Sequence, residues 1–226
     1  GIKGKSFIER ACTQLEDRYL GNANIFKEEE KKVLIKDFDK DLRPQLITKP
    51  LFDNIKDYDS ISKMQYIDIH TWLRGDILTC ADRMTMANSV DLRVPFLDNE
   101  VADYAFQLNG HEKITCHTTK YALREAFKDI IPKSACNRPK LGFPVPIKYW
   151  LRDELYSWAE NLMVESKTVE IINKSYGLEL LQRHKKGGVD YSRRIWTILI
   201  FIIWYNLYIE DDGKDIWNDS IRGFKK

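Results

Sequence analysis

The longest helical pattern in the chain, from about Ser62 to Val90, places the strongest constraint on the fold. On a helical wheel centred on Ile77, a set of apolar and small residues falls within roughly 80° of that position. These residues are Ile69, Leu73, Cys80, Ala81, Met84 and Ala87. The pattern predicts one long amphipathic helix with this stripe buried. Pro95 ends any continuation, because proline cannot join the helical hydrogen-bond ladder.

The rest of the chain is also helical in pattern. Shorter helices are predicted over about residues 99–108, 119–131, 147–158, 170–185 and 195–208, and no run is typical of a strand. The apolar run from Ile195 to Ile209 is 15 residues long, whereas a membrane span needs about 20 apolar residues. We therefore expect this run to be a core helix in a mainly α bundle of about eight to ten helices.

Charge and cysteine usage exclude several functional classes. Lys and Arg total 36 and Asp and Glu total 34, a net charge of +2, which gives no support for broad nucleic-acid or membrane-surface binding. The cysteines form no CxxC pair, and the four histidines show no metal-ligand spacing. The cysteines are Cys12, Cys80, Cys116 and Cys136. The sequence therefore predicts no metal ligands, no disulfide scaffold and a reducing, cytoplasmic setting.

A rigid cationic loop, CNRPKLGFPVP, runs from Cys136 to Pro146. Its three prolines and its glycine are incompatible with a regular helix or a central strand. Arg138 and Lys140 lie inside it. A lysine acts on a phosphate as a point charge, an arginine can bind two oxygens at once, and both work best when pre-positioned. We interpret the loop as a phosphate-binding element, with the alternative that both cations are solvated on a surface loop.

A second candidate pair, Asp76 and Arg83, lies on the long helix. The two residues are seven positions apart, which corresponds to about 10.5 Å along a helix axis. This separation is too large for a direct ion pair but suits two groups that bracket a ligand. We assign Arg83, with Arg138, to substrate or phosphate binding. The alternative is an ordinary polar edge of an amphipathic helix. Farther along, Asp98 is expected to cap the N-terminus of the next helix.

Three stretches occur in an informative order: GDILTCADRMTMANSVDLRVPFLDNEVADYAF, TTKYALREAFKDIIPKSACNRPKLGFPVPIKYWLRDEL and RRIWTILIFIIWYNLY. Together they resemble the C-terminal half of the synthetase domain of glutamine-hydrolysing asparagine synthetase. The resemblance covers almost the whole chain, and its RVPFLD and RPKxGFPVP elements are specific. It implies that ATP activates aspartate as a β-aspartyl-AMP with release of pyrophosphate, and that ammonia from glutamine attacks this intermediate.

The resemblance also implies roles for individual residues. The family's lysine in the RxKxGF element lies near the phosphates and the acyl intermediate, and it corresponds to Lys140, with Arg138 beside it. The family's acidic residue on the long helix corresponds to Asp76. Lys120 and Arg124 match a KxxLR element, for which a structural role is expected.

Several parts of that family do not occur in this sequence. They are the glutaminase domain with its N-terminal cysteine, the SGGxDS phosphate loop and the SGEGxDE-like motif. The resemblance therefore implies a fragment: residues 1–226 form a single mostly helical region, the C-terminal portion of an α/β adenine-nucleotide-hydrolase-like (ATP pyrophosphatase) domain. ATP and Mg²⁺ would be bound mainly by the missing part, and this chain alone would be inactive.

Two alternatives to an asparagine synthetase fragment remain. One is a related cyclising enzyme that adenylates a carboxylate, of the type that makes β-lactams or lasso peptides. The other is a helical interaction module without catalysis. For the first reading, the expected partners are aspartate, ATP, and glutamine or ammonia, with no nucleic acid and no membrane. A homo-oligomer is compatible with the sequence.

Overall fold

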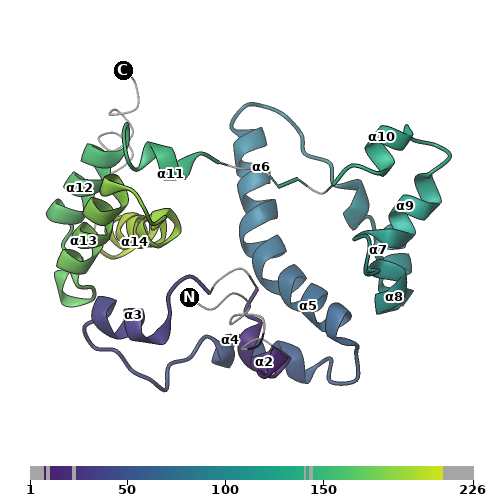
Figure 1. Ribbon diagram of the computed structural model, residues 1–226, viewed down its shortest axis with the longest axis horizontal. Helices are drawn as coiled ribbons and strands as arrows, with labels where there is room; N and C mark the ends of the chain where they lie inside the picture. Colours follow the sequence, from purple (N-terminus) through teal and green to yellow (C-terminus); the bar gives the residue numbers. More distant parts are fainter. Residues whose placement is uncertain (1–7, 9–10, 22–23, 140, 143–144, 211–226) are drawn as a thin grey trace. The chain divides into compact units, whose positions relative to one another are not determined.

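The computed structural model describes residue 8 and residues 11–21, 24–139, 141–142 and 145–210 of the chain (Figure 1). The described part of the chain is mainly helical, as the sequence predicts. Among the described residues, β-type pairing is limited to two isolated bridges, Ile35 with Ile172 and Ile114 with Thr119. Although the sequence suggests a single region, the contacts divide the chain into two compact units. Unit 1 comprises residues 1–23 and 41–141, and unit 2 comprises residues 24–40 and 142–226. Whether the two fold as one domain stays a prediction.

Unit 1 contains the long helical run and the short helices that flank it. Its described elements are α2 (Leu15–Arg18), α4 (Gln45–Asp53), α5 (Ser60–Asp68), η1 (Ile69–Ile77), α6 (Leu78–Met86), η2 (Pro95–Leu97), α7 (Asn99–Gln107), α8 (Gly110–Lys113), α9 (Tyr121–Phe127) and α10 (Lys133–Cys136).

The predicted long helix is confirmed as a continuous run of α5, η1 and α6. It begins at Asp59, whose carboxylate accepts hydrogen bonds from the backbone N–H groups of Ile61 and Ser62. Its middle third, η1, is wound as a π-helix, a rare geometry with i→i+5 hydrogen bonds that often marks functional sites. The predicted cap of α7 is also confirmed, because Asp98 accepts a 3.0 Å hydrogen bond from the backbone N–H of Glu100.

The small core of unit 1 lies at the N-terminal third of this run. Phe52, Ile55 and Ile67 are buried there, and α2 and α4 pack around them. The hydroxyl of Tyr19 donates a 2.7 Å hydrogen bond to the Asp68 carboxylate at the end of α5. Burial, followed by this contact with a carboxylate, raises the pKa of Tyr19. The N-terminal segment is thereby attached to the long run.

The predicted burial of the apolar stripe is wrong. From residue 68 to residue 135, all of which the structure describes, no side chain is buried, and Met84 is 68% exposed. Helical periodicity identifies an apolar face but does not show that another element covers it. Within unit 1, α4 and α8 pack on α5, the first third of the run, and leave η1 and α6 uncovered. The π-helical turns also change the angular step that the wheel assumes.

Unit 2 is a helical cluster with a larger core. Its described elements are α3 (Glu28–Leu34), α11 (Ile147–Trp150), α12 (Tyr156–Glu165), η3 (Thr168–Glu170), α13 (Lys174–Lys186), α14 (Ser192–Tyr205) and η4 (Asn206–Glu210). The single helix predicted over residues 147–158 is instead two helices, α11 and α12. The backbone N–H of Leu155 bonds the carbonyl of Trp150, five residues back, where the α-helical ladder is broken.

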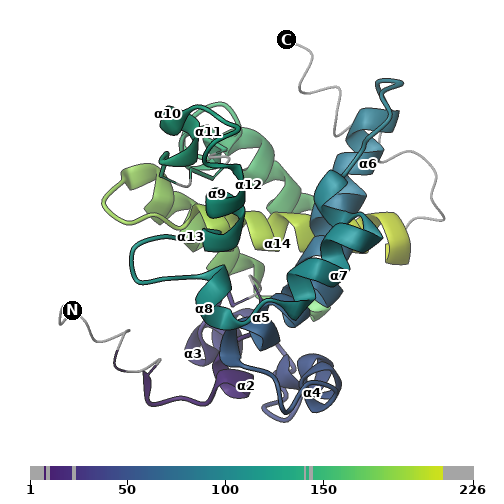
Figure 2. The ribbon, with the colours of Figure 1, turned by 90° about the vertical axis from the view of Figure 1, so that its right-hand side faces the viewer.

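Helices α12, α13 and α14 pack together around this core (Figures 1 and 2). Ile195, Ile198, Leu199 and Ile202 of α14 are all buried, which confirms that the apolar run is a core helix. Gly177 of α13 allows close packing, because a Cβ atom there would lie 3.3 Å from the sulfur of Met163. Within the described residues, every helix is too short or too polar to cross a membrane.

Candidate functional site

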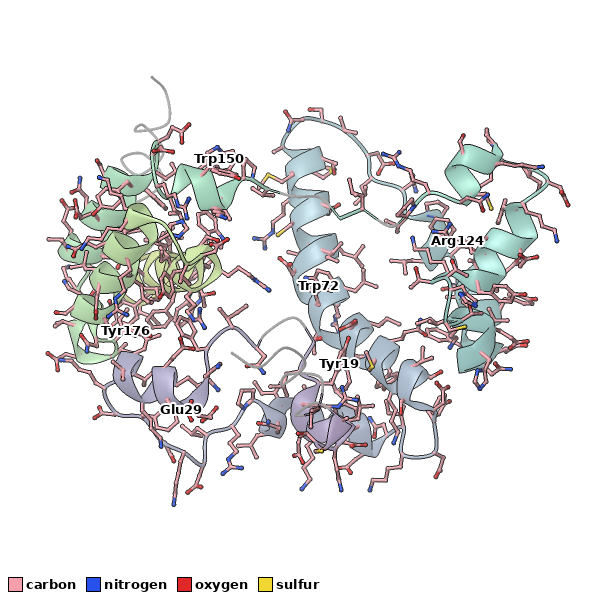
Figure 3. All side chains as sticks on the ribbon, viewed as in Figure 1. Tyr19, Glu29, Trp72, Arg124, Trp150 and Tyr176 are labelled. Carbon is pink, nitrogen blue, oxygen red and sulfur yellow. The ribbon has the colours of Figure 1, made fainter. Side chains whose placement is uncertain are left out.

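Asp76 lies in the π-helical segment, and its carboxylate is held by two neighbours on the same run. The indole Nε1–H of Trp72 donates a 2.9 Å hydrogen bond to Oδ2, and the thiol of Cys80 donates a 3.5 Å hydrogen bond to Oδ1 (Figure 3). Asp76 is exposed, so its two donors orient a carboxylate that solvent or a ligand can still reach.

Arg83 follows on α6 and is also exposed. Burial raises the pKa of the Cys80 thiol, and the adjacent Asp76 carboxylate raises it further, whereas the positive charge of Arg83 lowers it. The thiol is therefore within electrostatic range of both candidates. Among the described residues, no hydrogen bond or ion pair joins Asp76 directly to Arg83, which agrees with the separation predicted from the sequence.

Arg138 is in the loop that follows α10, and it is exposed. Its backbone carbonyl accepts a 3.0 Å hydrogen bond from the guanidinium of Arg124. Lys140, the predicted catalytic lysine of this loop, lies outside the described residues. Both flanks of the loop are described, and each is anchored by a side chain within its own unit.

The anchor on the N-terminal flank is Arg124 of α9, labelled in Figure 3. Besides the carbonyl of Arg138, its guanidinium donates hydrogen bonds to the backbone carbonyls of Thr119, at 3.0 Å, and of Cys136. In return, the buried thiol of Cys136 donates to the backbone carbonyl of Arg124 at 3.5 Å. The KxxLR element gives a structural role to this arginine, but not the loop as its partner.

The anchor on the C-terminal flank is His184 of α13, which is fully buried. Its Nε2–H group donates a 2.8 Å hydrogen bond to the carbonyl of Lys148 in α11, while Nδ1 accepts one of 3.2 Å from the backbone N–H of Tyr191. The Nε of Arg152 completes the contact by donating to the carbonyl of His184 at 3.1 Å. Both ring nitrogens of His184 are thus used in hydrogen bonds to the backbone, which join α13 to α11 and to the segment before α14.

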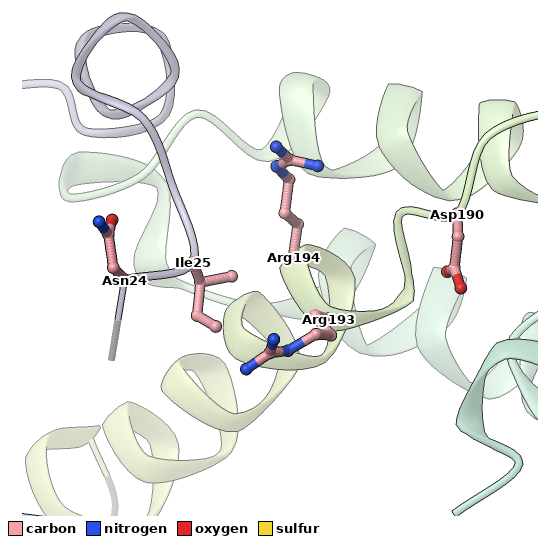
Figure 4. Close-up of a pocket in the computed structure, with 5 residues that line it drawn as sticks. All are labelled: Asn24, Ile25, Asp190, Arg193 and Arg194. Carbon is pink, nitrogen blue, oxygen red and sulfur yellow. The ribbon is translucent and has the colours of Figure 1, made fainter. Parts of the chain in front are cut away.

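Unit 2 also has an open pocket of about 230 Å³, between the start of α14 and the segment that precedes α3 (Figure 4). Asn24, Ile25, Asp190, Arg193 and Arg194 line it. The Nε of Arg194 lies 2.9 Å from Oε1 of Glu30, and Nη2 donates a 3.2 Å hydrogen bond to Oε2, so this guanidinium binds α3. Of the site residues predicted from the sequence, those that the structure describes, Asp76, Arg83 and Arg138, do not line this pocket.

Comparison with known proteins defines the class to which these features belong. The model of the asparagine synthase family matches residues 5–206. The chain is 51% identical over 210 residues to asparagine synthetase [glutamine-hydrolyzing] 1 of Bacillus subtilis. The aligned region covers 93% of this chain and 33% of that protein. A putative asparagine synthetase [glutamine-hydrolyzing] of Mycobacterium bovis is 44% identical, with 93% and 32% covered. The human asparagine synthetase [glutamine-hydrolyzing] is 29% identical over 134 residues, with 51% and 24% covered.

The chain therefore belongs to the asparagine synthase family. It spans about a third of the length of the most similar relatives named above. No solved structure matches the chain.

Proposed function

We propose that this chain is the helical C-terminal part of the synthetase domain of a glutamine-hydrolysing asparagine synthetase. The observation that carries the proposal is the 51% identity to a relative of that name over 93% of the chain. The rest of such a domain would be an α/β fold of the adenine-nucleotide-hydrolase type. Because the chain spans a third of that relative, the activity described below is proposed for the longer protein.

The proposed reaction has two steps. A side-chain carboxylate oxygen of aspartate attacks the α-phosphorus of ATP, and pyrophosphate leaves. Ammonia, released from glutamine, then attacks the acyl carbon of β-aspartyl-AMP, AMP leaves, and asparagine forms after loss of a proton. Both steps place negative charge on phosphate oxygens, which fixed cations stabilise.

We assign that role to Lys140, with Arg138 beside it as a second cation for the phosphates. Prolines on both sides restrict the backbone of this segment, and Arg124 holds the carbonyl of Arg138. Asp76 is proposed to orient the attacking ammonia, or to accept the proton that its nitrogen loses after bonding to the acyl carbon, since Trp72 holds its carboxylate while leaving it exposed. Arg83 is proposed to bind substrate one to two turns farther along the run.

ATP and Mg²⁺ are proposed to be bound mainly outside this chain. Among the described residues, no group of three His, Cys, Asp or Glu side chains could hold a metal ion. The proposed substrates are aspartate, ATP, and glutamine or ammonia. A cytoplasmic location and an assembly of identical copies stay predictions.

The test uses the full-length protein that contains this chain. It is incubated with ATP, Mg²⁺, aspartate and either glutamine or ammonium, and AMP, pyrophosphate and asparagine are measured. Equal amounts of all three products support the proposal. Formation of AMP and pyrophosphate with a different carboxylate substrate and no asparagine would indicate a cyclising relative. No nucleotide turnover with any carboxylate would indicate a non-catalytic helical module.

A further inference from the structure

The backbone N–H groups of Asn137 and Arg138 donate to the carbonyls of Lys133 and Ala135, so the start of the cationic loop is short of donors for its carbonyls rather than of acceptors. Helix α10 ends at Cys136, and the carbonyls of a helix's last turn have no N–H donors inside the helix. The carbonyl of Arg138 directly precedes Pro139, and prolines at positions 139, 144 and 146 remove N–H donors from the segment. Donors for these carbonyls must therefore come from a side chain or from water.

Arg124 supplies these donors from a different helix. Its single guanidinium reaches three carbonyls, those of Thr119, Cys136 and Arg138, which lie before α9, at the end of α10 and in the loop. The Cys136 thiol, buried beside it, returns a hydrogen bond to the carbonyl of Arg124. Only a planar group with several fixed donors can make this set of contacts, because a lysine ammonium is a compact point charge.

The geometry points to Arg124 as a positioning residue for the cationic loop, which fixes the backbone from Cys136 to Arg138 and thereby the origin and direction of the Arg138 side chain. This inference rests on the proposed function, in which the cations of this loop bind the phosphates. Among the described residues, the hydrogen bonds of the Arg124 guanidinium all go to backbone carbonyls. It acts on the reaction through the loop, and misplacement of a reacting group by about 1 Å can reduce a rate about 100-fold.

The first arm of the test measures the position of the backbone and does not depend on activity. In the full-length protein with every cysteine except Cys136 replaced by serine, including Cys12, Cys80 and Cys116, the reaction of the buried Cys136 thiol with a disulfide reagent is followed. Arg124→Ala is expected to accelerate this reaction at least about tenfold, Arg124→Lys to accelerate it less, and the control Arg183→Ala to leave it unchanged. Arg183 is a matched control because its guanidinium pairs with Glu179 on the surface of α13. An unchanged rate in both Arg124 variants would overturn the inference.

The second arm measures synthesis of asparagine by the same variants with the native cysteines. Arg124→Ala is expected to lower kcat about 10- to 100-fold with a smaller change in the KM for ATP, and to leave glutamine hydrolysis within a few fold. Ethylguanidinium in the buffer should restore part of the kcat of Arg124→Ala, whereas ethylammonium at the same ionic strength should not. A general loss of folding would not respond to the shape of the added cation. If Arg124→Ala fails to fold, Arg124→Lys carries both arms.

The two arms distinguish the inference from the proposed function. A wild-type protein without aspartate-dependent release of pyrophosphate would refute the proposed function, and the thiol reaction would still show whether Arg124 holds the loop. An active wild-type protein whose Arg124 variants keep wild-type kcat would refute the positioning role alone.

Discussion

The Nε2–H group of His184 donates a 2.8 Å hydrogen bond to the backbone carbonyl of Lys148 and so joins the C-terminal end of α13 to α11. The other ring nitrogen accepts from the backbone N–H of Tyr191. Because backbone groups contact both nitrogens, the orientation of the ring inside the core is fixed. The helix that follows the proline-rich loop is thereby held to the body of unit 2.

His184→Ala is expected to destabilise this part of unit 2 by about 2–4 kcal/mol, because it leaves a buried carbonyl and a buried N–H without partners and creates a cavity. Hydrogen–deuterium exchange of peptides covering residues 147–151 and 188–192 in the full-length protein measures the effect locally. Arg183→Ala, one residue earlier and exposed, should change the opening free energy by less than about 0.5 kcal/mol. Equal protection in wild type and His184→Ala would show that the hydrogen bonds of His184 do not stabilise this part of unit 2.

The stabilisation that the Asp59 cap gives to the start of the long helical run should depend on pH. The Ser62 hydroxyl, 2.6 Å away, and the backbone N–H groups of Ser62 and Ile61 hold the pKa of Asp59 below its usual value. Since the folded pKa lies below the unfolded one, this stabilisation is fully present above the unfolded value of about 3.9 and is lost as the pH falls through the lower folded value.

Asp59→Asn is therefore expected to reduce the acid dependence of the urea midpoint below about pH 4, because asparagine caps a helix without titrating. Asp59→Ala should cost about 1 kcal/mol at neutral pH. Asp57 is an exposed neighbour outside the cap. Asp57→Asn is therefore the control, and its urea midpoint should depend on pH as that of wild type does. An Asp59→Asn midpoint that falls with acid as steeply as that of wild type would contradict the assignment.

Trp72 is expected to matter through the hydrogen bond that it donates to Asp76. Trp72→Phe keeps an aromatic ring but removes the indole N–H, so the Asp76 carboxylate keeps only the weaker donor, the Cys80 thiol, of the two described here. In the full-length protein we expect asparagine synthesis to fall about tenfold, and Asp76→Ala to cost more. Trp204→Phe is the matched control, since this exposed tryptophan of α14 contacts rings that phenylalanine can also contact. Wild-type synthesis by Trp72→Phe would leave the orienting role without support.

The uncovered apolar side chains of unit 1 should drive association of the 226-residue chain. From residue 68 to residue 135 no side chain is buried, and several large apolar ones are well exposed. They include Met84, Met86, Phe96, Tyr104 and Ile130. Apolar patches larger than a few hundred Å² tend to be interaction surfaces. Sedimentation velocity over a concentration series should show self-association, and Met84→Lys should weaken it. A chain that stays monomeric and binds no hydrophobic dye would contradict this prediction.

Local sequence determined much of the helical architecture. The 3.6-residue period indicated the run from α5 to α6, and Asp98 indicated the start of α7, because both signals depend on residues within a few positions of each other. Burial of the Ile77 face was predicted wrongly because burial depends on what packs against a helix, which periodicity does not contain. The π-helical winding of residues 69–77 does not follow from the apolar period, because that period is that of an α-helix.

The candidate site was predictable only in part. Asp76, Arg83 and Arg138 lie in the elements where the sequence analysis put them, but the partners of Asp76 follow from side-chain rotamers. Arg124 reaches residues 12 and 14 positions away, across the turn between α9 and α10. A usable signal existed, since a loop rich in proline has carbonyls without neighbouring donors and an arginine precedes it on a helix. Its partners could not be chosen without the path of the chain.

Lys140→Ala in the full-length protein is expected to abolish most asparagine synthesis while sparing glutamine hydrolysis. A cation fixed where phosphate charge develops acts mainly on the transition state, so kcat should fall more than KM rises. The loss of one such pre-organised contact typically costs about 100- to 1,000-fold in rate. Glutamine hydrolysis is proposed to occur at a separate site, so glutamate release should stay within a few fold of wild type.

The side-chain chemistry at position 140 separates a catalytic lysine from a solvated one. Lys140→Arg keeps the positive charge, but a planar guanidinium cannot replace a compact ammonium in a tight site, so it should restore only part of the rate. Lys148→Ala, farther along the chain in α11, is the control: its backbone carbonyl, which binds His184, is retained. Formation of AMP and asparagine is measured beside release of glutamate for each variant. Near wild-type kcat in Lys140→Ala would mean that this lysine is only solvated, and the phosphate-binding role would then fall to Arg138 or to residues outside the chain.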